Sequence, residues 1–112
     1  MPTSGDVVRV DLGTPVGSEA GMIRPAVVVT AQRVLEHSPT VVQVVPLTRT
    51  IRGWTSEVTI SADPGLGLDQ VSAAQCQHIR AVSTHRIVDA VGNVGPVSLR
   101  QIRETVAVLL DL

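Results

Sequence analysis

The residues that could do chemistry in this sequence are arginines and hydroxyl side chains at the ends of apolar runs. Arg24 precedes a proline and a valine-rich run, and Thr48 follows a second such run. His37, His78 and His85 lack the spacing of metal ligands, and there is no phosphate loop, dinucleotide fingerprint or readable Ser-His-Asp arrangement. Because guanidinium and hydroxyl groups bind phosphate oxygens, this pattern favours phosphate chemistry without a metal or another cofactor.

The composition limits the classes of function. The chain has 112 residues and a formal charge of −1, and all nine of its cationic side chains are arginines. Because the net charge is so small, the whole molecule does not attract nucleic acid, and binding would need a local patch of positive charge. We expect a cytoplasmic protein, because the sequence shows no secretion signal and no apolar run of the ~20 residues that span a membrane. Cys76 is the only cysteine and is expected to be a small buried apolar residue.

Apolar alternation and turn residues divide the chain into short strands. The core must come from valine, leucine, isoleucine and alanine, since there is no Phe or Tyr, and β-branched residues favour sheets. Alternation predicts a half-buried strand over residues 5–12, followed by a loop over 13–21. Further strands are expected at 26–31 (opened by Pro25), 40–47, 55–60, 71–82 and 87–94, with a helical turn within 32–39, a turn at 63–67 and a corner at 83–86.

The C-terminal segment has the period of a helix. Ser98 and Gln101 match a capping box, and the apolar residues that follow one helical face are Leu99, Ile102, Val106, Leu109 and Leu110. About six strands and one terminal helix predict a mainly β (α+β) fold with a single domain over residues 1–112. We expect a small, strongly bent sheet or barrel with the helix packed across it.

Several segments, taken in order, carry a resemblance. Gly5 to Leu12, Gly17-Ser18-Glu19, Arg24-Pro25 with its valines, Pro46-Leu47-Thr48 and Ile79 to Ser83 resemble the motifs of the MazF/PemK-type toxins. The resemblance covers nearly the whole chain. It implies an SH3-like, partly open barrel of the CcdB/PemK type with a C-terminal helix, and a homodimer. It also implies a sequence-specific endoribonuclease that cuts single-stranded RNA, and a partner antitoxin whose extended segment covers the RNA surface.

The resemblance assigns catalysis to Arg24 and Thr48. Cleavage without a metal uses the 2′-hydroxyl of the RNA and leaves a 2′,3′-cyclic phosphate and a 5′-hydroxyl. A fixed guanidinium can stabilise the negative charge that develops on phosphorus, and the Thr48 hydroxyl and amide can hold a phosphate oxygen. The identity of the general base stays open, because arginine holds its proton too tightly to be a good base, and Glu19 is a candidate proton acceptor.

The remaining predicted site residues bind substrate. They are Gly17, Ser18, Glu19, Arg49, Gln77, His78 and Arg80, of which the first three form a loop that can close over RNA. The chain departs from the family at Gln77-His78, where many relatives have Glu-Gln and use the Gln in RNA recognition. His78 either reads a base or phosphate or is an ordinary surface histidine, and this departure leaves the cleavage sequence open.

Arg49, Arg52 and Trp54 follow Thr48 in a predicted loop. The arginines could grip flanking phosphates, and Trp54 either stacks on an unpaired base or packs in a dimer interface or at the barrel rim.

Two alternative functions use the same fold. A related group of toxins poisons DNA gyrase, but it depends on a tryptophan-containing C-terminal end, whereas this chain ends in Leu110-Asp111-Leu112. The other alternative is an inactive module that only binds RNA or an antitoxin-like peptide.

Overall fold

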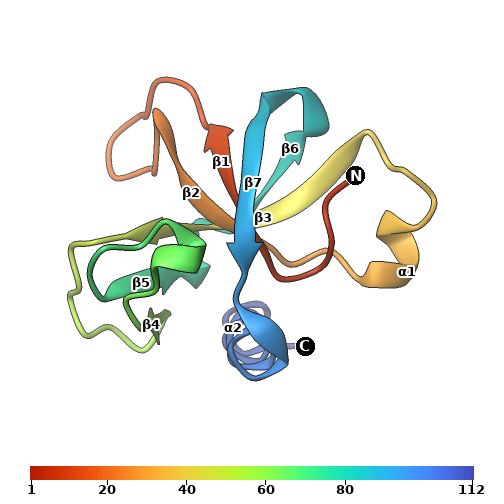
Figure 1. Ribbon diagram of the computed structural model, residues 1–112. Coiled ribbons are helices and arrows are strands. Elements are labelled where there is room, and N and C mark those ends of the chain that lie inside the picture. Colours follow the sequence, from red (N-terminus) through yellow and green to blue (C-terminus); the bar gives the residue numbers. More distant parts are fainter.

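The computed structural model describes residues 1–112, and the segments rich in valine and alternating apolar residues form strands in it (Figure 1). The strands are β1 (Asp6–Asp11), β2 (Ile23–Val28), β3 (Val41–Thr48), β4 (Glu57–Ile60), β5 (Ser72–Gln75), β6 (Arg80–Ser83) and β7 (Ile87–Asn93). The helices are α1 (Gln32–Leu35), which is the expected single turn, and α2 (Gly95–Leu110). Three 3₁₀ turns, η1 (Pro64–Leu66), η2 (Cys76–His78) and η3 (Thr84–Arg86), complete the elements.

The strands form one bent antiparallel sheet. Their order is β4-β5-β3-β2-β1-β7, and β6 pairs with the first half of β3. β6 and β7 are joined through η3 but do not pair with each other, so the sheet curls without closing. This confirms the predicted partly open barrel with a C-terminal helix, with seven strands in place of about six.

The additional strand arises because the predicted strand at 71–82 is two strands. β5 pairs with the end of β3, where Ala74 lies opposite Leu47, and β6 pairs with its beginning, where Arg80 lies opposite Val44. The η2 turn lies between them and has no partners in β3. The alternation of the sequence could not reveal this break, because η2 includes the buried Cys76 and so continues the apolar pattern.

β2 begins earlier than predicted, at Ile23, and it ends at Val28 rather than at residue 31. Pro25 is therefore inside the strand, opposite Arg9 of β1. This is compatible with its missing N–H because β3 pairs with β2 only from Ala26 onward, so Pro25 has a neighbouring strand on one side only. The early start is what places Arg24 within a strand.

Valines on alternate strand positions fill two apolar clusters on opposite faces of the sheet. One cluster lies inside the curl and contains Val8, Val10, Leu12, Ala26, Val28, Leu35, Val42, Val44 and Val82. The other lies beneath β4, β5 and α2 and contains Val7, Val27, Val45, Leu47, Val58, Ile60, Leu66, Leu68, Ala74, Cys76 and Ile102. Cys76 is fully buried there, as the sequence predicted, and desolvation raises the pKa of its thiol to about 11.

α2 follows β7 and lies below the strands in Figure 1, where it contacts β4 and η2. Ser98 and Gln101 do not form the predicted capping box, because the helix begins three residues earlier, at Gly95. The Gly95 amide instead donates to the Asn93 side-chain oxygen at 2.8 Å. Leu99 and Ile102 are buried as predicted, whereas Leu109 and Leu110 are exposed. No helix in the structure is long and apolar enough to cross a membrane.

Candidate active site

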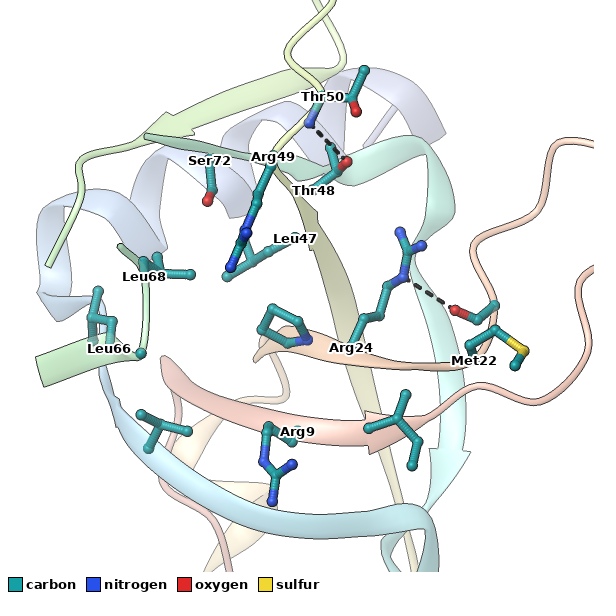
Figure 2. Close-up of a pocket in the computed structure, with 15 residues that line it drawn as sticks. Arg9, Met22, Arg24, Leu47, Thr48, Arg49, Thr50, Leu66, Leu68 and Ser72 are labelled. Carbon is teal, nitrogen blue, oxygen red and sulfur yellow. Dashed lines mark hydrogen bonds between the residues drawn. The ribbon is translucent and has the colours of Figure 1, made fainter. Parts of the chain in front are cut away.

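Arg24 and Thr48 line the same cavity, of about 410 Å³, which we call the Arg24 cavity (Figure 2). Figure 2 shows the Arg24 side chain extending from β2 toward the strand end that carries Thr48, with Arg49 directed into the cavity beside Leu47. The walls come from four parts of the fold: Gly21–Pro25, Leu47–Thr50, Leu66–Leu68 with Ser72, and Arg9 with Val91. The sheet thus assembles the predicted catalytic pair.

Arg24 is held by one contact and is otherwise unpaired. Its Nε donates to the Gly21 carbonyl oxygen at 3.2 Å, and neither terminal nitrogen has a hydrogen-bond partner in the protein. None of the ten carboxylates forms an ion pair with it; the two ion pairs of the structure join Arg9 to Asp89 and Arg49 to Asp69. The guanidinium therefore keeps two N–H-bearing groups and its full charge available for an anion.

The backbone before Arg24 is tightly constrained. Gly21 packs against Pro15 so closely that a Cβ would overlap the proline ring. Met22 has a positive φ of 63°, which costs an L-residue roughly 1–2 kcal/mol. Two hydrogen bonds hold it there, from the Met22 amide to the Gly13 carbonyl at 2.6 Å and from the Leu12 amide to the Met22 carbonyl at 2.9 Å. This strained corner fixes the carbonyl that orients Arg24.

Thr48 is partly buried at the end of β3, and its hydroxyl can donate a hydrogen bond. Its Oγ1 accepts the Thr50 amide at 3.1 Å, so the hydroxyl hydrogen is left for another acceptor. Arg49, the next residue, is exposed, and its Nη2 lies 3.1 Å from Asp69 Oδ1. Such exposed pairs contribute only about 0–1 kcal/mol, so a phosphate can replace the carboxylate at little cost.

Four other predicted residues gather in a second cavity, of about 350 Å³, which we call the Gln77 cavity. Glu19, Gln77, His78 and Arg80 line it. Both amide atoms of Gln77 are buried without a hydrogen-bond partner in the protein. Buried polar atoms are normally bonded, so this amide has unused capacity for a ligand or water. Arg80 is tied down, since its Nη1 donates to the Leu12 carbonyl at 3.1 Å.

Only the end of the 13–21 loop, at Gly21, lines the Arg24 cavity. Gly17 and Ser18 are exposed at its tip and line neither cavity, and Gly17 has a φ of +58°. The Glu19 carboxylate accepts the Val16 amide at 2.9 Å, which folds the tip on itself. Glu19 thus lies in the Gln77 cavity and not beside Arg24 and Thr48.

Sequence reasoning missed several residues that build the site. The Gly21 carbonyl, held by the Met22 corner, orients Arg24, and Asp69 pairs with Arg49. Leu66 and Leu68 form one wall of the Arg24 cavity. The Gly-rich character of 13–21 signalled a tight loop, but which carbonyl meets Arg24 depends on the folded path. No group of three or more His, Cys, Asp or Glu side chains in the structure could hold a metal ion.

The comparisons place the chain in a known family. The family described as PemK-like, MazF-like toxin of type II toxin–antitoxin system matches residues 3–110, so the chain belongs to this family, as its motifs suggested. Endoribonuclease MazF9 of Mycobacterium tuberculosis is 35% identical over 117 residues, covering 100% of this chain and 98% of that protein.

Solved structures agree in fold. MazF from Deinococcus radiodurans (crystal Form-I) superposes with a TM-score of 0.80 at 22% identity, covering 99% of this chain and 97% of that one. An endoribonuclease in complex with its cognate antitoxin from a Mycobacterial species has a TM-score of 0.79 at 25% identity, covering 100% of this chain and 97% of that one. The expected barrel is thereby confirmed by both comparisons.

Proposed function

We propose that this toxin-family protein is an endoribonuclease that cuts single-stranded RNA in the Arg24 cavity, without a metal ion or other cofactor. The observation that carries the proposal is the unpaired guanidinium of Arg24 in the same cavity as the Thr48 hydroxyl. The 35% identity to an endoribonuclease over the full chain supports the same activity. A cytoplasmic location fits an RNA substrate.

The chemistry follows from what these two side chains offer. The RNA 2′-oxygen attacks phosphorus, so a 2′-O–P bond forms while the P–O5′ bond breaks; the 2′-hydroxyl proton goes to a base and the leaving O5′ takes a proton. The products are a 2′,3′-cyclic phosphate and a 5′-hydroxyl end. Arg24 donates N–H groups to the phosphate oxygens as their negative charge grows, and Thr48 donates its hydroxyl.

The Gln77 cavity supplies sequence selection in this proposal. An unpaired base has donors and acceptors on its edge, and the free Gln77 amide can pair with both kinds. His78 and Glu19 lie in the same cavity and add a second set of polar groups, so Glu19 serves recognition here in preference to proton transfer. Gly17 and Ser18 form the tip that closes over the RNA.

The protein acts as a homodimer and is held inactive by an antitoxin whose extended segment lies over the RNA surface. This part of the proposal is supported by the family and by the related endoribonuclease that was solved with its cognate antitoxin. The exposed arginine at position 49 is a contact that acidic groups of such a segment can take over from Asp69.

Two substitutions test the assignment of the cavity. Removing a preorganised donor to a developing anion costs about 10²–10³ in rate, so Arg24→Ala and Thr48→Val should each lose that much RNA cleavage while folding normally. Arg33→Ala, which removes an exposed arginine of α1 that lines neither cavity, is the matched control. EDTA should leave wild-type cleavage unchanged, measured on a long RNA by gel.

The outcomes separate this function from its alternatives. An Arg24→Ala protein that cuts as fast as wild type would contradict the mechanism. Wild-type protein that binds RNA without cutting any tested sequence would indicate a binding module. Inhibition of gyrase supercoiling by protein that leaves RNA intact would indicate a gyrase poison.

A further inference from the structure

The loop between β3 and β4, residues 49–56, has a folded tip that the active site does not use. The Glu57 carboxylate gathers three successive amides of this loop on one oxygen: Arg52 at 3.1 Å, Gly53 at 2.8 Å and Trp54 at 3.3 Å. The Glu57 amide in turn donates to the Trp54 carbonyl at 3.0 Å. These charge-assisted bonds fix the conformation of the tip, and the carboxylate faces the loop's own amides.

The tip presents a cation on an exposed aromatic ring. Trp54 is 54% exposed and belongs to neither apolar cluster. The Arg52 guanidinium carbon lies 5.2 Å from the centre of its ring, within the range of a cation–π contact. Trp54 is also the only aromatic residue of the Phe, Tyr and Trp types in the chain. The ring therefore offers solvent a large aromatic surface with a cation beside it, on which a planar ligand can stack.

We propose that Arg52 and Trp54 form a stacking platform for an unpaired nucleobase of the RNA next to the cut, with Glu57 as the residue that positions it. The inference rests on the proposed endoribonuclease function and extends the RNA site beyond its two cavities. Every base has a π-face, so the platform adds affinity without choosing a sequence, while the Arg52 charge favours the phosphate that accompanies the base.

Continuity with the active site favours RNA over another occupant of this surface. The loop leaves the Arg24 cavity directly from Thr48, Arg49 and Thr50, which line it, and it lies at the periphery of the molecule (Figure 1). Trp54 is the sixth residue after Thr48, and an extended chain of that length spans at most roughly 20 Å. Trp54 therefore lies within that distance of Thr48, near enough for one RNA strand to contact both.

Intrinsic fluorescence reports on this platform without background, because Trp54 is the sole tryptophan. The probe is an RNA of the mapped cleavage sequence with 2′-O-methyl groups, which binds but cannot be cut since the nucleophile is blocked. Stacking should quench Trp54 emission saturably as this RNA is added to wild-type protein. Saturable binding measured by anisotropy of a labelled strand, with no change in Trp54 emission, would overturn the proposal.

Substitutions then measure the contribution of the platform. Trp54→Ala should weaken binding of the 2′-O-methyl RNA about 5- to 150-fold, the range given by one lost base–aromatic stack. It should raise KM for cleavable RNA by a similar factor with kcat within about threefold of wild type. Trp54→Phe should recover most of the affinity. Val97→Ala, an exposed apolar residue of α2, should change neither constant.

Glu57→Gln tests the positioning role. The amide keeps one acceptor but loses the charge, so the tip loosens while β4 stays paired with β5. KM should rise by part of the Trp54→Ala factor, and the double variant should be no worse than Trp54→Ala alone. Additive effects of the two substitutions would show that Glu57 does not act through Trp54.

The remaining outcomes distinguish this platform from other surfaces. Trp54 emission that changes on dilution of the protein alone, and not with RNA, would assign the ring to an interface between copies and overturn the platform. If wild-type protein cuts RNA and Trp54→Ala has unchanged RNA affinity and KM, the platform is overturned and the nuclease function stands. Quenching by RNA that the wild type never cuts would leave the platform standing and remove the nuclease function.

Discussion

At the scale of single residues, the site depends on which charges are left unpaired. Arg9 and Asp89 are bound to each other through two hydrogen bonds of 2.9 and 2.7 Å, and Arg49 is paired with Asp69. Arg24, which lines the same cavity, has only a carbonyl at its Nε. A guanidinium that is oriented by a neutral group keeps its charge for the ligand, whereas a carboxylate partner would have competed with the phosphate.

The orientation of Arg24 has an energetic cost in the backbone. Met22 holds a positive φ, and Gly21 accepts no side chain because Pro15 lies against it. Strain of this kind persists where the surrounding hydrogen bonds over-determine the conformation, and here it lies two residues before the candidate catalytic arginine. The fold thus stabilises a corner that the isolated segment would not favour.

Cys76 gives a prediction at this scale. The side chain is fully buried, and desolvation raises its thiol pKa to about 11, so almost no thiolate exists near neutral pH. Native protein should react with iodoacetamide at about pH 8 far more slowly than urea-unfolded protein, as followed by mass spectrometry. Labelling of the native protein at the unfolded rate would contradict the buried position.

At the scale of elements, the close contact between β7 and η1 holds one wall of the Arg24 cavity. A Cβ added at Gly92 would overlap the Gly65 carbonyl oxygen and come within 3.0 Å of Leu66. Backbone cannot move aside as a flexible side chain can, so Gly92→Ala should destabilise the protein by about 1–3 kcal/mol. Urea unfolding measures this loss of stability. Gly95→Ala is the control: a Cβ there contacts no other atom, but the φ of +85° strains an alanine, so this variant shows the cost of backbone strain without steric overlap.

The β1–β7 pair carries a pH-dependent contribution. The hydrogen bond from Arg9, together with its charge, lowers the pKa of the Asp89 carboxyl. Because the folded pKa lies below the unfolded value of about 3.9, the stabilisation is present above that value and is lost as the pH falls through the folded pKa. Asp89→Asn should lower the urea midpoint slightly at about pH 7, and the difference should vanish in acid.

The matched control for that comparison is Glu36→Gln, an exposed carboxyl in neither ion pair. A deficit of Asp89→Asn that stayed constant down to acidic pH would point to lost packing in place of the ion pair.

Helices, strands and turns were predictable from the sequence where a local pattern of residues determines them. The strand over residues 6–11, the turn around Pro64 and the helical face through Leu99 and Ile102 follow from alternation, turn residues and the 3.6-residue period. Boundaries set by tertiary partners were not predictable. Pro25 lies inside β2 only because β3 leaves its side unpaired, and η2 interrupts the apolar run only because β3 pairs with both of its flanks.

The candidate site divides in the same way. The types of Arg24 and Thr48 and their places at strand ends were visible in the sequence, and the fold brings them into one cavity. That Glu19 joins Gln77 and His78 in a different cavity was not visible, since it depends on how the 13–21 loop folds back. The contacts of Glu57 with the 49–56 loop likewise depend on how that loop folds back, so the sequence does not reveal them.

At the scale of the whole molecule, a chain of net charge −1 must bind RNA through a local set of arginines. Arg24, Arg49 and Arg52 lie in or beside the Arg24 cavity. If each neutralises one phosphate, log K for single-stranded RNA should fall with log salt with a slope of about −2. Arg49→Gln should make the slope shallower by about 0.7, while Arg33→Gln should not change it.

The central claim is that Arg24 and Thr48 support cleavage by the 2′-hydroxyl of the RNA. The most direct test is to map both new ends of a long RNA after incubation with wild-type, Arg24→Ala and Arg33→Ala protein in the presence of EDTA. We expect 5′-hydroxyl and 2′,3′-cyclic phosphate ends at defined sequences for wild type and Arg33→Ala, and about 10²–10³-fold fewer for Arg24→Ala. Ends carrying a 5′-phosphate, or equal cutting by Arg24→Ala, would contradict it.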